Sequence, residues 1–204
     1  MTYNLVDKVV IITGANSGIG RAAAIQLAQA GATVVMACRN MERGAQALEE
    51  VRLTASSNRV DLMRVDMSSQ ASIHQFAREF LVRYPRLDVL IHNAANFDQT
   101  LKKPVLTEDA LETIFATNHL GPFLLTQLLL DLLKASAPSR IITVASKGLL
   151  IFPFLNIEFD NLNGEKKFSV THAYYHLDSS SKCNKLKPKE YLKRGGKIEA
   201  FSGA

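Results

Sequence analysis

Short apolar runs alternate with helical patterns over the first 145 residues, and this alternation constrains the fold more than any other feature. Five runs are mostly β-branched and continuously apolar, which is typical of strands in a parallel sheet covered on both faces. They are Lys8–Thr13, Thr33–Cys38, Val60–Asp66, Leu87–His92 and Arg140–Val144. Helical patterns fill Ile19–Ala30, Met41–Thr54, Ser72–Tyr84 and Glu108–Ala135. This order, with long crossovers between strands, predicts an α/β fold with a doubly wound parallel sheet.

Two residues support the predicted helix ends. Asn40 is placed to cap the second helix, and Gly31 follows the first helix, where a glycine commonly ends one.

The pattern changes after the fifth run. Residues 147–173 are polar and aromatic and are expected to form a loop. A further helix is predicted to start near Tyr174, but Pro188, Gly195 and Gly196 limit it, and no later strand pattern follows. We therefore expect a sheet that is truncated after the fifth strand and the start of that helix. The predicted organisation is a domain over residues 1–186, followed by an atypical basic tail over 187–204.

The charge of the chain lies at its end. The net charge is +5, and the segment from Lys182 to Ala204 holds seven basic and two acidic residues, so residues 1–181 are neutral overall. A neutral body does not favour nucleic-acid binding. The most apolar segment, Leu120 to Leu133, is too short to span a membrane, and no secretory signal is recognised. The cysteines Cys38 and Cys183 lie far apart, which suggests reduced thiols and a cytoplasmic protein.

A glycine-rich loop directly follows the first predicted strand and opens into a helix. Gly14, Gly18 and Gly20 allow a tight turn and a close backbone approach, and the helix N-terminus offers N–H groups and a positive dipole. An ordinary strand–helix turn is the alternative. The order strand, glycines and helix instead favours a phosphate-binding loop of a Rossmann-type fold.

The spacing Gly-x-x-x-Gly-x-Gly, with later segments, resembles the classical short-chain dehydrogenase/reductase family, retinol-dehydrogenase-like branch. The resemblance covers residues 5 to about 183 and marks the chain as C-terminally truncated. It implies that the loop binds a nicotinamide cofactor, with Asn16, Ser17 and Ile19 beside the three glycines. It also implies that Asp66 contacts the adenine and that Asn93 belongs to the turn after the fourth strand.

Arg39, 19 residues past Gly20, bears on the choice of cofactor. A carboxylate there would favour NAD, whereas an arginine can bind the 2′-phosphate of NADP. Arg39 could also be a solvated cation. We predict NADP, with Arg21 as a second phosphate contact.

The resemblance also implies a catalytic set. A tyrosine acts as general acid and base, a lysine four residues later lowers its pKa, a serine polarises the carbonyl, and an asparagine supports a proton-relay water. Asn118, Ser146 and Lys182 match three of these positions. Because tyrosine has an ordinary pKa near 10, the proton transfer needs the neighbouring cation.

The tyrosine departs from the pattern. Asp178 lies four residues before Lys182, and the nearest tyrosines, Tyr175 and Tyr174, lie seven and eight residues before it. On a helix, four residues rise about 6 Å and seven about 10.5 Å. Tyr175 is our candidate for the proton transfer.

Two functions remain open. The first is an NADP-dependent oxidoreductase that acts on a carbonyl or alcohol substrate of apolar character, with Phe152, Phe154 and Phe159 either lining its pocket or serving as packing. The second is a truncated, non-catalytic member that binds nucleotide weakly or pairs with a full-length partner. A homodimer through the long helices is also compatible with the Leu-rich segment. The five histidines show no metal-ligand spacing, so no metal is predicted.

Overall fold

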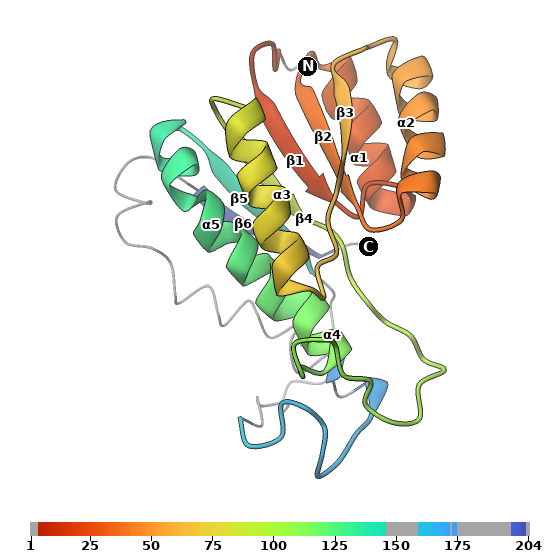
Figure 1. The fold of residues 1–204 in the computed structure, drawn as a ribbon. Coiled ribbons are helices and arrows are strands. Elements are labelled where there is room, and N and C mark those ends of the chain that lie inside the picture. Colours follow the sequence, from red (N-terminus) through yellow and green to blue (C-terminus); the bar gives the residue numbers. More distant parts are fainter. Residues whose placement is uncertain (1–3, 146–158, 172, 175–196, 203–204) are drawn as a thin grey trace.

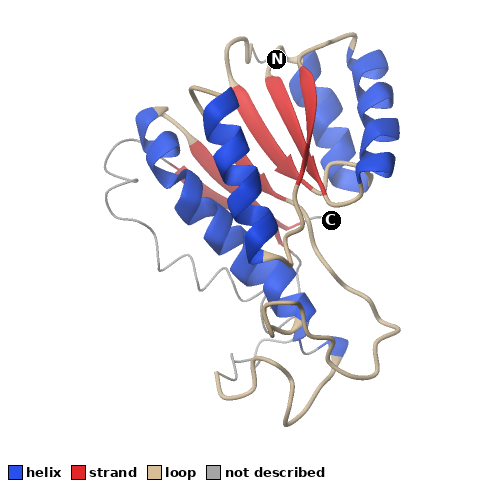
Figure 2. Cartoon of the chain, viewed as in Figure 1, coloured by secondary structure: helices blue, strands red, loops and turns tan. Residues whose placement is uncertain are grey.

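The computed structural model describes residues 4–145, 159–171, 173–174 and 197–202. These residues form one parallel sheet with the strand order β3-β2-β1-β4-β5-β6, and helices cover both faces of the sheet (Figures 1 and 2). The described elements are β1 (Val9–Thr13), α1 (Gly18–Gln29), β2 (Thr33–Cys38), α2 (Met41–Ala55), β3 (Val60–Arg64), α3 (Gln70–Arg83), β4 (Val89–His92), α4 (Thr113–Phe115), the π-helical turn η1 (Ala116–Leu120), α5 (Gly121–Ala135), β5 (Arg140–Ala145) and β6 (Lys197–Ser202). The predicted doubly wound α/β fold is confirmed.

Two hydrophobic cores lie on opposite faces of the sheet. On β1, Val9 and Ile11 join the core made with α3 and α5, whereas Val10 and Ile12 join the core made with α1 and α2. Successive side chains of a strand point to opposite faces, and both faces are buried. The neighbouring strands β1 and β2 are therefore almost continuously apolar, as the sequence predicts, whereas β3 carries Asp61 and Arg64 and is only partly buried.

The helix boundaries follow from local hydrogen bonds. The Asn40 side chain accepts a hydrogen bond of 2.9 Å from the Arg43 N–H and caps α2. Gly31 adopts a φ of +97° just after α1, a backbone conformation that favours glycine. Both predictions are confirmed.

The long helix expected over 108–135 begins later and is not continuous. The Glu112 carboxylate accepts a hydrogen bond of 2.8 Å from the Phe115 N–H, so helical structure begins at Thr113. The next turn, η1, is π-helical, and α5 continues to Ala135. None of the described helices combines the length and apolar character needed to cross a bilayer.

The expectation that no strand follows β5 is wrong. Residues 197–202 form β6, which pairs in parallel with β5 from Arg140↔Lys197 to Ala145↔Ser202. The outer edge of β5 would otherwise present unpaired N–H and C=O groups, which another segment can satisfy by pairing. The predicted boundary near residue 186 lies outside the described residues.

Asp88, directly before β4, ties the amino ends of two neighbouring strands together. Its carboxylate is only 3% exposed and accepts hydrogen bonds from the Val9 N–H, Lys8 and Arg86, at 2.9, 3.1 and 2.6 Å for the nearest atoms. Burial alone would raise the pKa of Asp88, but these hydrogen bonds outweigh it and hold the pKa below its ordinary value.

We expect Asp88→Ala to lower the free energy of unfolding by about 2 kcal/mol at neutral pH, because it leaves a buried N–H and two cations without their acceptor. The native carboxylate stabilises the fold only when ionised, so this loss should shrink as the pH falls below about 4. Urea unfolding measures both effects. Asp131→Ala is the control, because Asp131 is 98% exposed in its pair with Lys134 and should change stability by less than about 0.5 kcal/mol. Equal effects of the two variants would contradict this account.

Candidate functional site

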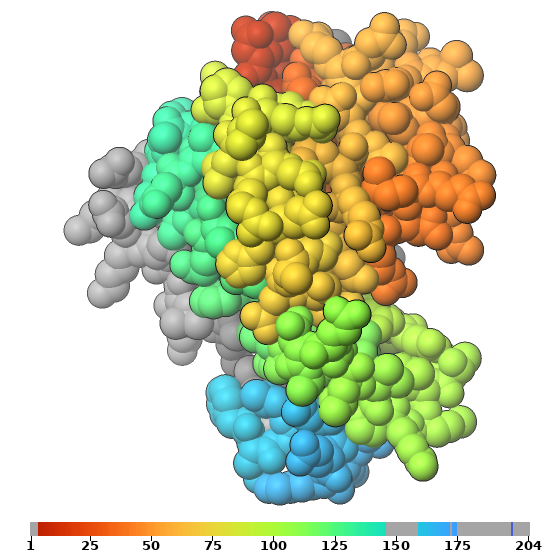
Figure 3. Space-filling view, viewed as in Figure 1, coloured from red at the N-terminus to blue at the C-terminus, as the bar shows by residue number. Residues whose placement is uncertain are grey.

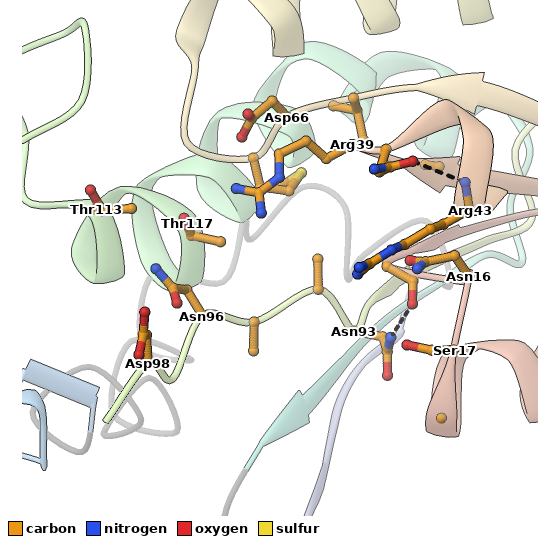
Figure 4. Close-up of a pocket in the computed structure, with 18 of the residues that line it drawn as sticks. Asn16, Ser17, Arg39, Arg43, Asp66, Asn93, Asn96, Asp98, Thr113 and Thr117 are labelled. Atoms are coloured by element: carbon orange, nitrogen blue, oxygen red, sulfur yellow. Dashed lines mark hydrogen bonds between the residues drawn. The ribbon is translucent and has the colours of Figure 1, made fainter. Parts of the chain in front are cut away.

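A cavity of about 790 Å³ lies at the carboxyl ends of the central strands. Its walls come from the glycine loop after β1, residues 39–43 after β2, residues 65–67 after β3 and the segment 93–98 after β4. In Figure 4, Asn16 and Ser17 lie on one side of this space, and Thr113 and Thr117 lie on the other. The cavity spans the point where the strand order reverses between β1 and β4, which is where open α/β sheets bind ligands.

Each of the three loop glycines meets a different steric or conformational requirement. Gly14 has a φ of +67°, and an added Cβ would lie 2.9 Å from the Ala94 Cα atom. Gly18 has a φ of +52° but open space around it. At Gly20 an added Cβ would lie 2.5 Å from the Asn93 Nδ2 atom and 2.6 Å from the Gly14 carbonyl oxygen. Gly14 and Gly18 line the cavity with Asn16, Ser17 and Ile19, whereas Gly20 acts behind it by allowing close packing.

Asn93 joins the glycine loop to β4. Its side-chain amide donates to the carbonyl oxygens of Thr13 and Gly14 at 3.0 and 3.1 Å. The Thr13 hydroxyl in turn accepts the N–H groups of Asn93 and Ala94, both at 3.0 Å. Asn93 also lines the cavity, so the carboxyl ends of β1 and β4 and the loop form one hydrogen-bonded unit.

His92, the residue directly before Asn93 in the sequence, is buried. The Nε2 atom of His92 lies 2.8 Å from the Thr126 hydroxyl of α5. Burial lowers the pKa of His92 to about 4, so the imidazole is neutral at pH 7. His92 is therefore a packed hydrogen-bonding residue that adds no charge beneath the cavity.

Two arginines give one part of the cavity a positive charge. Arg39 follows β2, and Arg43 lies in the first turn of α2, and both line the cavity (Figure 4). Among the described residues, no ion pair joins either guanidinium to a carboxylate. The N-terminus of α2 adds its dipole. This region is therefore suited to an anion such as a phosphate.

The structure changes the assignment of the second arginine. Arg21 does not line the cavity, because its guanidinium pairs with Glu50 of α2 at 2.6 Å. Arg21 is thus held away from the cavity, whereas Arg43, which the sequence pattern did not single out, lines it. The available signal was the position of Arg43 in the first turn of the helix that Asn40 caps, directly after Arg39.

Asp66 and Thr117 lie on the far wall from the glycine loop. The Asp66 carboxylate accepts hydrogen bonds from the Ser68 N–H and hydroxyl at 2.9 and 2.6 Å. The Thr117 hydroxyl oxygen is buried and, among the described residues, has no hydrogen-bond partner. Both residues line the cavity, although the Thr117 hydroxyl oxygen itself is buried.

Asn118 lies in η1 but does not line the cavity. Its side chain accepts from the Asn96 N–H at 2.7 Å and donates to the Asn96 carbonyl oxygen at 2.9 Å. Both the oxygen and the nitrogen of the amide thus hold the segment after β4 against the π-helical turn. This makes Asn118 a positioning residue, whose side chain fixes neighbouring backbone.

The other three predicted catalytic residues, Ser146, Tyr175 and Lys182, lie outside the described residues, as do Phe152 and Phe154. Tyr174 is described, and its ring centroid lies 4.3 Å from that of Phe97. Tyr174 packs beside a small apolar cluster that includes Ile114, Phe115 and Val170. Phe159 is 78% exposed and packs against little.

Comparison with known proteins gives a consistent result. The family profile described as short chain dehydrogenase matches residues 8–151. Human retinol dehydrogenase 11 is 42% identical over 203 residues, which cover 98% of this chain and 61% of that protein. A protein from Mycobacterium paratuberculosis has a TM-score of 0.78 at 29% identity and matches 98% of this chain and 69% of its own. A short chain dehydrogenase from Escherichia coli, solved with NADPH, has a TM-score of 0.75 at 24% identity and matches 99% of this chain and 78% of its own.

The contact between Gly20 and Asn93 gives a direct test of the loop. We expect Gly20→Ala to lower the free energy of unfolding by about 3 kcal/mol, because the new Cβ displaces the Asn93 amide from the loop carbonyls. Gly18→Ala is the matched control and should lose only about 1 kcal/mol, from its positive φ. Urea unfolding compares the two variants, and the reverse order would contradict the assigned roles.

Proposed function

The chain belongs to the short-chain dehydrogenase family, and on this premise we propose that it is an NADP-dependent oxidoreductase that acts on a carbonyl or alcohol substrate. The observation that carries the proposal is the cavity, which has a glycine loop at a helix N-terminus on one wall and Arg39 and Arg43 beside it. When bound, the cofactor supplies or accepts a hydride. The chain's residues must hold it, orient the substrate and move a proton.

The cavity residues suit each polar part of a dinucleotide. The N–H groups after Gly14 and the dipole of α1 are suited to the pyrophosphate. Asp66 is suited to the adenine, as the family resemblance implies. Asn93 keeps the floor of the cavity rigid through its hydrogen bonds to the loop.

Arg39 and Arg43 support NADP over NAD. The two cofactors differ by the 2′-phosphate, and a pair of guanidinium groups without carboxylate partners among the described residues favours that extra anion. A carboxylate at position 39 would instead accept from the free ribose hydroxyl of NAD. The Escherichia coli protein with the same fold was solved with NADPH, which agrees with this choice.

For the chemistry, we assign the roles that the resemblance implies. Ser146 orients the substrate oxygen, Tyr175 gives or takes the proton, and Lys182 favours the ionised tyrosine by its charge. Asn118 contributes by fixing the backbone at Asn96 next to the cavity. Because proton transfer depends on the exact positions of the reacting groups, loss of the hydrogen bonds between Asn118 and Asn96 would affect turnover more than cofactor affinity.

An apolar substrate fits the wall made by the loop after β4. Leu101 and Val105 line the cavity at this end, and the Phe97 and Tyr174 rings pack together nearby. The relative from human is named for retinol, which is itself an apolar alcohol. The substrate proposed for this chain is of that apolar class.

Nucleotide binding without turnover is the second candidate. The observation that favours it is Asp178, which stands where the resembling family has its tyrosine, four residues before Lys182. The chain spans about 61% of the length of human retinol dehydrogenase 11. The cavity would serve this function equally well, so turnover and binding must be measured separately.

The cofactor assignment predicts a selective loss of affinity. Arg39→Gln and Arg43→Gln should each weaken NADPH binding about ten-fold or more, because each removes a charged contact to the 2′-phosphate. NADH binding should change less than about two-fold. Fluorescence titration measures both affinities, with Arg21→Gln as a control that removes the same charge outside the cavity. Equal losses for NADPH and NADH would contradict the assignment.

The catalytic assignment predicts that Tyr175→Phe lowers turnover of an apolar aldehyde by about 100-fold or more, with NADPH affinity unchanged. Absorbance of NADPH follows the reaction. Tyr174→Phe is the neighbouring control and should retain turnover. A loss in Tyr174→Phe alone would place the proton transfer on Tyr174, and NADPH binding without any turnover in the unmodified chain would support the second candidate.

A further inference from the structure

A segment from late in the chain packs against the loop that follows β4. Apolar side chains of residues 159–171 join those of residues 97–120 in one small cluster. In Figures 1 and 3 the later segment, coloured blue, lies against the green loop at the lower end of the molecule. The loop brings Leu101, Val105 and Thr113 to the cavity. The shape of the apolar end of the cavity therefore depends on what holds these two segments together.

Asn163 joins the two segments through both groups of its side-chain amide. The Oδ1 atom accepts a hydrogen bond of 3.1 Å from the Glu112 N–H, and the Nδ2 atom donates one of 3.3 Å to the Ala110 carbonyl oxygen. The next residue, Gly164, packs against the same loop, because an added Cβ there would lie 3.5 Å from the Pro104 Cβ atom. The amide of Asn163 is therefore seated on the loop and is half-buried there.

The turn that Asn163 contacts, residues 107–112, contains a strained residue. Ala110 has a φ of +57°, in the left-handed region that disfavours a side chain. Within the turn, the Thr107 N–H donates to the Leu111 carbonyl oxygen at 2.8 Å, and the Ala110 N–H donates to the Thr107 carbonyl oxygen at 3.0 Å. Strained backbone persists where surrounding contacts hold it, and such residues are concentrated at functional sites. Asn163 supplies contacts of this kind from outside the turn.

The end of this turn is connected to the wall of the cavity. Glu112 is 1% exposed, and its carboxylate caps α4 by accepting the Phe115 N–H at 2.8 Å. Thr113 donates its N–H and its hydroxyl to the Val105 carbonyl oxygen, at 2.9 and 2.6 Å. Thr113 and Val105 both line the cavity. The hydrogen bonds of Asn163 thus act, through Glu112, on the backbone that carries one end of the cavity.

We propose that Asn163 is a positioning residue that sets the affinity of the cavity for an apolar substrate. Its hydrogen bonds to Glu112 and Ala110 hold the substrate end of the cavity in place, and this role rests on the proposed function. The cofactor contacts do not depend on it, because the glycine loop, Arg39 and Arg43 lie on other walls of the cavity (Figure 4). Loss of Asn163 therefore shifts the substrate end while the cofactor end stays in place.

The first test is the steady-state reduction of octanal by NADPH. Asn163→Ala should raise KM about ten-fold, because two hydrogen bonds that hold the wall are lost. The kcat and the NADPH affinity should change less than about two-fold, because the wall contributes equally to binding of the ground state and the transition state. Asn163→Asp keeps the volume of the side chain but replaces the donor to Ala110 with an acceptor, so KM should rise by a similar factor of about ten.

Asn161→Ala is the matched control. Asn161 lies in the same segment, and its side-chain amide also makes two hydrogen bonds to backbone, but to Lys166 and Lys167 of its own segment, at 2.9 and 3.0 Å. The control variant should change KM, kcat and NADPH affinity less than about two-fold. Thermal unfolding checks that each variant folds.

The second test does not require turnover. Amide hydrogen exchange of the full chain should show the N–H groups of Thr113 and Phe115 exchanging about ten-fold faster in Asn163→Ala but not in Asn161→Ala, because the turn before them opens more often. NADPH binding without turnover in the unmodified chain would contradict the proposed function alone. The affinity for octanal, measured through the fluorescence of bound NADPH, then replaces KM as the test of Asn163.

The proposal is overturned by an unchanged KM or octanal affinity in Asn163→Ala, by unchanged amide exchange, or by equal effects of Asn163→Ala and Asn161→Ala. A matching loss of NADPH affinity in Asn163→Ala would show a general structural role and would also overturn it. So would a failure of the unmodified chain to bind octanal in the presence of NADPH.

Discussion

The hydrogen bonds between Asn93 and the turn after β1 are the contact on which the site depends. They bring the carboxyl ends of β1 and β4 and the glycine loop into one unit. The close approach requires Gly20, because a Cβ there would overlap both the Asn93 amide and the Gly14 carbonyl. The helix N-terminus that follows is thereby aimed at the cavity. The close packing of Gly20 against Asn93 and Gly14 thus fixes the conformation of the loop residues that line the cavity.

The electrostatics of the cavity depend on which cations are already paired. Arg21 lies in the first turn of the helix that follows β1, and Arg39 and Arg43 follow β2, but Glu50 pairs only with Arg21. The remaining two guanidinium groups face the cavity with the N-terminus of α2. Below the same cavity, His92 is kept neutral by burial. The positive charge is therefore confined to one part of the site, which suits a cofactor that carries one distinguishing phosphate.

The π-helical turn shows how one side-chain amide can fix the backbone beside the cavity. The Asn118 amide accepts a hydrogen bond from the Asn96 N–H and donates one to the Asn96 carbonyl oxygen. These bonds fix the segment after β4 where it enters the cavity wall. Such turns often occur at functional sites because the wider turn displaces backbone from the regular helical path. The same region carries the apolar contacts between Phe97 and Tyr174 and the cluster around Ile114. The loop after β4 thus brings both polar residues, such as Asn96 and Asp98, and apolar residues, such as Leu101 and Val105, to the cavity.

The sequence alone determined the layered fold, most element boundaries and the glycine loop, because these depend on local periodicity, on caps such as Asn40 and on the backbone freedom of glycine. Arg39, Asp66 and Asn93, which the sequence singled out, all line the cavity. Only the tertiary structure decided that Arg43 rather than Arg21 faces it, because ion pairing depends on a neighbouring helix that supplies Glu50. Likewise, the polar segment 197–202 has no strand pattern of its own, and it becomes β6 because the edge of β5 offers unpaired backbone groups.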